Sequence, residues 1–212
     1  MLEQLLVDLS GREKAEVLDQ FRMIVGSIII LASPLSTHSL AQMLGMSADA
    51  INDILDWFHS VLSIPSASGS PVRLIHLSFR DFLLDPEKRE TNPFWVDEQQ
   101  THERLATHCL RVMKGCLRAD ICELQAPGTP RLSISSATIE ASLPSEVQYA
   151  CLYWVYHVEQ SQVPPYDGDQ VHDFLCRYFL QWLEALSIIG RASEGISIIK
   201  ILQSHVKVSR LS

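Results

Sequence analysis

One histidine, His76, lies between Ile75 and Leu77 in the mostly apolar run PVRLIHLSFRDFLLD (residues 71–85), where a strand-like pattern gives way to a helix-like one. An imidazole ring changes charge near neutral pH and can both donate and accept hydrogen bonds. At this position it either packs in a core or faces a charged group. Taken alone, the chain favours a hydrogen bond from His76 to a neighbouring carbonyl or carboxylate of its own domain.

A second group of side chains has the types that bind zinc: His102, His108, Cys109, Cys116 and Cys122. Their spacings match none of the common zinc sites, in which ligands come in short, regular pairs. A single helix face accounts for most of these positions. We therefore expect no metal site.

The signatures of common enzyme classes are absent from the sequence. It contains no glycine-rich phosphate loop, no G-x-S-x-G, no H-E-x-x-H and no C-x-x-C. Cysteine–histidine pairs could be assembled in many ways, so their mere presence indicates no nucleophile. The sequence predicts a chain without catalytic activity and without a cofactor of its own.

Charge and cysteine usage narrow the class of protein further. Seventeen Lys and Arg residues against twenty-five Asp and Glu give a net charge of −8, which repels nucleic acid. Five cysteines, an odd number placed mostly in helical patterns, argue against a disulfide framework and favour the reducing cytoplasm. The longest apolar run, residues 24–32, is too short to cross a bilayer, so we expect no membrane association.

The elements that must position His76 are predicted in residues 12–90, after an N-terminal helical tail at residues 1–11. A long amphipathic helix precedes Pro34, Ser36 or Thr37 can cap a short helix that ends near Gly45, and Ser47 can cap a third. Two β-like runs then flank the turn SASGS, as a wing hairpin would. This order predicts a winged-helix domain.

A helix-turn-helix raises the alternative of a DNA-binding regulator. Its second helix, however, carries Asp49, Asp53 and Asp56, and no Lys or Arg occurs between Met23 and Val72. Recognition helices depend on basic and amide side chains to approach phosphates and base edges. The motif is therefore expected to serve packing, with Ile51, Ile54, Leu55 and Phe58 on its inner face.

Residues 91–212 are predicted to form a helical bundle domain, so the chain as a whole is mainly α. Asp97 can cap its first helix, and Pro144 fits the first turn of another. A third, QVHDFLCRYFLQWLEALSIIG, is apolar nearly all round and is expected to be buried between neighbours, with Gly190 at its end. The tryptophans are expected to be core or inter-helix anchors: Trp57, Trp95, Trp154 and Trp182.

Several longer segments resemble the region that follows the NTPase core in fungal NACHT-type NOD-like receptors. They are VLDQFRMIVGSIIILASPLSTHSLAQMLGM, HSVLSIP, PVRLIHLSFRDFLLD, FWVDE, VQYACLYWVYHV and FLQWLEALSIIGR. The resemblance implies a winged helix followed by a helical domain. It also implies a role in a signalling ATPase of the STAND class, coupling nucleotide state and ligand sensing to oligomerisation.

The same resemblance implies a role for His76. In NACHT proteins a histidine in an H-x-S-F context faces the β-phosphate of bound ADP, and His76 is followed by Ser78 and Phe79. The chain lacks a Walker A lysine, so ADP or ATP is expected only with a companion NTPase domain, in the same chain or another. A C-terminal repeat domain is the other partner that the resemblance implies.

Overall fold

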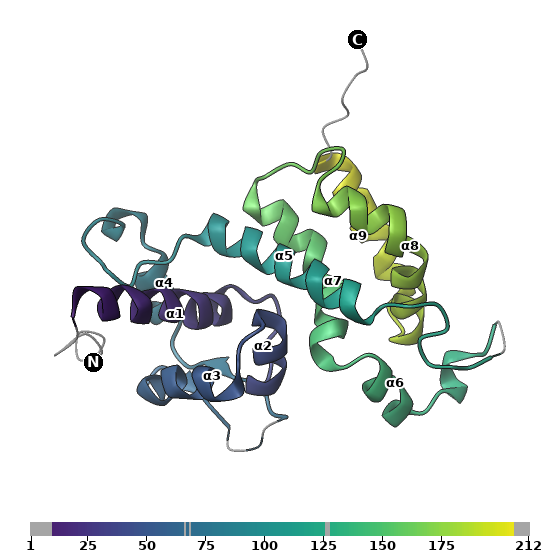
Figure 1. Cartoon of the computed structure of the whole chain (residues 1–212), viewed down its shortest axis with the longest axis horizontal. Helices are drawn as coiled ribbons and strands as arrows, with labels where there is room; N and C mark the ends of the chain where they lie inside the picture. Colours follow the sequence, from purple (N-terminus) through teal and green to yellow (C-terminus); the bar gives the residue numbers. More distant parts are fainter. Residues whose placement is uncertain (1–9, 66, 68, 126–127, 206–212) are drawn as a thin grey trace, which may run out of the picture. The chain divides into compact units, whose positions relative to one another are not determined.

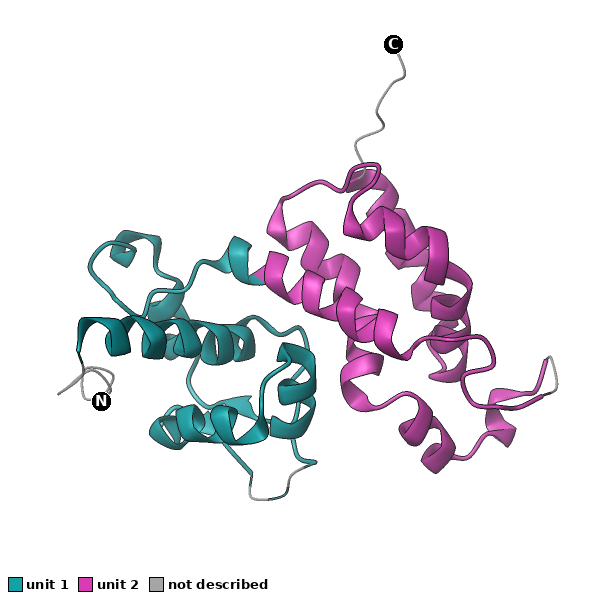
Figure 2. Ribbon diagram, viewed as in Figure 1, with its two compact units in different colours: residues 1–101 teal, residues 102–212 magenta. Residues whose placement is uncertain are grey.

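The computed structural model describes residues 10–65, 67, 69–125 and 128–205. It is mainly helical and divides into two compact units, Met1–Thr101 and His102–Ser212 (Figure 2). The predicted tail at residues 1–11 lies largely outside the described residues. The division between the units falls within α5, whereas the predicted domain boundary is at residues 90 and 91.

The first unit contains a run of helices, a two-stranded hairpin and further helical segments after it (Figure 1). In chain order its elements are α1 (Gly11–Ile30), α2 (Thr37–Leu44), α3 (Ala48–Leu55), the 3-10 helix η2 (Asp56–Phe58), β1 (Leu62–Ser63), β2 (Arg73–Leu74), α4 (Leu77–Leu84), the 3-10 helix η3 (Pro86–Lys88) and the start of α5 (Glu98–Cys116).

Local sequence signals explain where the first helices begin and end. Ser10 caps α1 in a capping box with Glu13, and Ser36 and Ser47 accept backbone N–H groups at the starts of α2 and α3. Gly45 ends α2 with φ +69°, a left-handed conformation that costs glycine little. The predicted caps are thereby confirmed, with Ser36 rather than Thr37 in the first.

The expected hairpin is present and antiparallel. Leu62 pairs with Leu74, and Ser63 pairs with Arg73. An isolated bridge joins Ser36 to Pro71, two positions before the second strand. The hairpin is therefore attached to the start of α2 and leads directly toward His76.

The core of the first unit is built around α1. The Phe21 ring lies 5.3 Å from that of Phe58 and 5.0 Å from that of Phe94, centroid to centroid. Gly26 allows Val96 to approach α1 so closely that an added Cβ would lie 3.1 Å from its Cγ1 atom. These contacts place the segment around residues 94–96 in the first unit.

The inner face of α3 is confirmed, but Trp57 differs from the prediction. Ile51, Leu55 and Phe58 are fully buried, whereas Trp57 is 51% exposed. The chain continues from α3 as a 3-10 turn, and Trp57 lies beside Phe58 on the outer side of it. Trp57 is therefore not a core anchor.

The second unit is a set of packed helices. Besides the rest of α5 it contains the 3-10 helix η4 (Arg131–Ser133), α6 (Ser136–Ser142), α7 (Ser145–Ser161), α8 (Gln170–Ile188) and α9 (Ala192–His205). The rings of Trp154 and Trp182 pack edge to face, with their centroids 5.8 Å apart. The Trp182 indole N–H donates a hydrogen bond to the Cys151 carbonyl at 2.9 Å. These two rings confirm the prediction of core tryptophans.

The prediction that α8 is buried between its neighbours is confirmed for one side of the helix only. Phe174, Trp182 and Leu186 are buried, but Leu180 is 73% exposed. The helix packs against α7 and α9 on one side, where Gly195 of α9 lets Leu186 come close. Its outer face keeps apolar residues that no described segment of this unit covers.

Candidate functional site

His76 lies at the junction of the hairpin and α4. The Ile75 N–H donates to the Val61 carbonyl at 2.9 Å, which extends the pairing of the strands by one residue. His76 follows with extended backbone (φ −125°, ψ 121°) and is the N-cap residue of α4. Phe79 and Leu83 are buried and anchor the helix. The position of His76 is therefore set by the elements on both sides of it.

The His76 side chain is exposed, and so are its neighbours. Ile75 is 49% exposed and Leu77 is 75% exposed. No residue in the described part of the chain forms a hydrogen bond or an ion pair with the His76 ring. The expected bond to a carbonyl or carboxylate of its own domain is therefore not present, and packing does not explain this histidine.

Ser78 belongs to the helix itself, in its second position, and does not cap it. No side chain of the described residues caps α4, so the N–H groups of its first turn have no side-chain acceptor among them. An exposed imidazole beside the positive end of a helix dipole suits an anion such as a phosphate. The junction can thus bind negative charge, in cooperation with groups from elsewhere.

Arg80 holds α4 in place. Its Nε donates to the Ile29 carbonyl at 3.2 Å, in the last turn of α1, and its Nη2 lies 2.9 Å from an oxygen of Glu98. The sequence suggests only a solvated face or a local ion pair for Arg80 and Asp81. The contact with α1 joins residues far apart in the chain, so no local pattern could predict it.

The exposed surface of α3 is acidic. Asp49, Asp53 and Asp56 are all exposed on or directly after α3, and Asn52 is exposed between them. Such a surface repels phosphate backbones and offers a single amide to base edges. The structure does not support the DNA-binding alternative.

The residues with zinc-ligand types do not meet at one site. In the described part of the chain, no group of three or more His, Cys, Asp or Glu residues is arranged to hold a metal ion. Cys109 is buried, and burial raises the pKa of its thiol. The Cys116 thiol instead donates to the Ser142 carbonyl, with sulfur and oxygen 3.4 Å apart.

A buried polar network in the second unit was not predicted. The His102 and His157 Nδ1 atoms lie 2.8 Å apart, and the Tyr149 hydroxyl lies 2.8 Å from Nε2 of His157. Burial and the nearby His102 ring lower the pKa of His157 to about 3. No sequence pattern distinguishes His157, because it occupies a regular position on the apolar face of α7.

Among the described residues, no helix is both long enough and apolar enough to cross a membrane.

Comparison with known proteins gives one informative similarity. No family model matches the chain, and no solved structure matches it. The chain is 28% identical, over 231 aligned positions, to the vegetative incompatibility protein HET-E-1 of Podospora anserina. The match covers 96% of this chain but only 16% of HET-E-1.

This similarity supports a relation to NACHT-type proteins, which is the family that the sequence segments resemble. It runs through both units, so the two are aligned together with one region of the fungal relative. A role in receptor-type signalling fits the relation.

Proposed function

We propose that this chain is a non-enzymatic regulatory and interaction module of a NACHT signalling receptor, of the STAND class. In this proposal the first unit is a winged-helix domain and the second is a helical domain. Together they couple nucleotide state and ligand sensing to oligomerisation in the cytoplasm. The relation to HET-E-1 and the helix–helix–helix–hairpin order of the first unit support the proposal.

The observation that carries it is the exposure of His76 at the uncapped start of α4. A phosphate favours the protonated imidazole, and the first-turn N–H groups of the helix add positive potential. His76 therefore fits a contact with the β-phosphate of ADP. The remaining groups that bind the nucleotide belong to a companion NTPase domain.

Such a contact makes the arrangement of domains depend on the nucleotide. A ligand shifts an equilibrium between two arrangements only by its difference in affinity for them. A bond between His76 and ADP exists only while the winged helix packs on the NTPase domain. Loss of ADP would therefore weaken the closed arrangement selectively and favour oligomerisation.

The test is the oligomeric state of an intact receptor that carries this chain joined to its NTPase domain. His76→Ala is expected to raise the oligomeric fraction in the ADP-bound protein, measured by light scattering after size-exclusion chromatography. His59→Ala is the matched control, because His59 is another exposed histidine of the same unit. An unchanged oligomeric fraction in H76A would contradict the proposal.

A further inference from the structure

A cavity of about 490 Å³ lies in the second unit, between the segment that follows α5 and the C-terminal half of α8. Asp120 and Leu124 line it from the first of these, and Glu184 and Ile188 line it from the second. Its volume lies within the range of small-molecule sites, about 300 to 1,000 Å³. None of the residues considered for the proposed function contributes to it.

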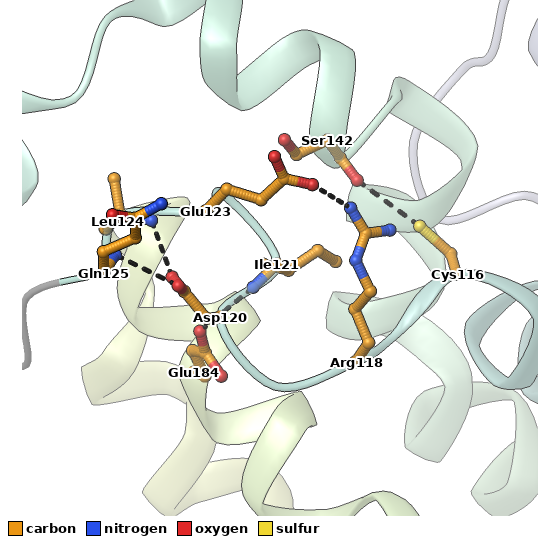
Figure 3. A network of polar contacts seen from close by, with 9 residues as sticks. All are labelled: Cys116, Arg118, Asp120, Ile121, Glu123, Leu124, Gln125, Ser142 and Glu184. Carbon is orange, nitrogen blue, oxygen red and sulfur yellow. Dashed lines mark hydrogen bonds and ion pairs between the residues drawn. The ribbon is translucent and has the colours of Figure 1, made fainter.

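Hydrogen bonds within the protein fix the acidic wall of the cavity (Figure 3). The two carboxylate oxygens of Asp120 accept the N–H groups of Leu124 at 2.7 Å and Gln125 at 3.0 Å. Glu184 accepts the N–H of the buried Ile121 at 3.3 Å through Oε1. Both carboxylates are thus held in place before any ligand arrives.

These two carboxylates have no cationic partner within the described ranges. Arg118, two positions from Asp120 in the sequence, pairs with Glu123 at 3.3 Å instead (Figure 3). Each oxygen of a carboxylate can accept more than one hydrogen bond. The wall formed by Asp120 and Glu184 can therefore accept bonds from an ammonium group.

The rest of the lining supplies a cation and an apolar surface. Arg131 lies over Gly190, where an added Cβ would be 3.0 Å from its Nε atom, and no described residue forms an ion pair with it. Leu124, Ile134 and Ile188 provide the apolar part. A complementary ligand has an ammonium group, a carboxylate and an apolar body between them.

We propose that this cavity binds a small zwitterion with apolar side chains, of the class of apolar amino acids and short peptides. The ammonium group contacts Asp120 and Glu184, the carboxylate contacts Arg131, and the side chains cover Leu124 and Ile188.

The test is calorimetric titration of the full chain with the dipeptide L-leucyl-L-leucine. Two analogues accompany it: the N-acetylated dipeptide, which lacks the ammonium group, and the dipeptide amide, which lacks the carboxylate. The unmodified dipeptide is expected to bind in the millimolar range or more tightly. The N-acetylated form is expected to bind at least about tenfold more weakly, because charge-assisted hydrogen bonds are lost.

Variants separate the contributions of the two ends. Glu184→Gln is expected to weaken binding of the dipeptide at least about tenfold. Glu140→Gln, at an exposed position of α6, is the control and should leave the affinity unchanged. Arg131→Gln should weaken binding of the dipeptide but leave binding of the dipeptide amide unchanged. Ser187→Phe fills the cavity from an exposed position and should abolish binding even if E184Q is poorly folded.

Three results would overturn the proposal. These are no saturable binding of the dipeptide at millimolar concentration, equal affinity for the N-acetylated form, and unchanged binding by S187F. None of them bears on the role proposed for His76, which lies in the other unit.

Discussion

The Nδ1 atoms of His102 and His157 lie 2.8 Å apart, and both rings are buried. One ring must donate the shared proton and the other accept it, so the pair is stable only while at least one ring is neutral. The contact links α5 to α7 inside the second unit.

The stability of the second unit is therefore expected to fall in mild acid. The pKa of His157 is lowered to about 3 by burial and by His102, whereas an unfolded histidine has a pKa of about 6.5. Between these values the unfolded chain binds more protons, so stability decreases as the pH falls from about 6.5 toward 3. At pH 5 the loss amounts to about 2 kcal/mol relative to neutral pH.

Urea unfolding at several pH values measures this effect. His157→Gln should flatten the dependence, and His38→Gln, at an exposed position, should leave it intact. Parallel pH profiles for the wild type and H157Q would contradict the assignment.

Leu55→Asp is expected to unfold the first unit. Leu55 is fully buried on α3, and an unpaired buried charge costs several kcal/mol. The exposed Asp53→Asn on the same helix is the control. Thermal melting followed by circular dichroism is the measurement, and an L55D chain that melts like the parent would show that the face is wrongly assigned.

Arg80→Ala is expected to destabilise the first unit by about 1 to 2 kcal/mol, because it removes the bond to the Ile29 carbonyl. Glu98→Gln should cost less than about 1 kcal/mol, since this ion pair is partly exposed to solvent. Urea unfolding of both variants shows which substitution lowers the stability more. If E98Q proved as costly as R80A, the ion pair and not the carbonyl bond would be the main contribution.

Cys176 is expected to be the first cysteine alkylated by limiting iodoacetamide. It is exposed, whereas burial raises the pKa of Cys151 to about 12 and also raises that of Cys109. Alkylation requires the thiolate and access to it. Peptide mapping by mass spectrometry gives the order, and equally rapid modification of Cys109 or Cys151 in the native protein would contradict it.

Short-range features of the fold could be predicted from the sequence. The caps at Ser36 and Ser47, the end of α2 at Gly45 and the buried side of α3 depend on neighbouring residues, which a sequence pattern records directly. The hairpin before His76 follows from the same kind of signal, two β-like runs around a turn.

Features that depend on long-range packing could not be predicted. The pairing of His102 with His157 joins residues 55 positions apart. Trp57 and Leu180 are apolar yet exposed, because neighbouring helices cover only one side of the elements that carry them. The position of His76 was predicted from its motif, but its exposure depends on how α4 is anchored.

The rate of ADP release tests the central claim about His76 most directly. A fluorescent ADP analogue is loaded into the intact receptor, and its dissociation is followed after addition of excess unlabelled ADP. The account predicts faster release from His76→Ala, at least about tenfold if one charge-assisted contact to phosphate is lost, and the wild-type rate from His59→Ala. Release from H76A at the wild-type rate would contradict it.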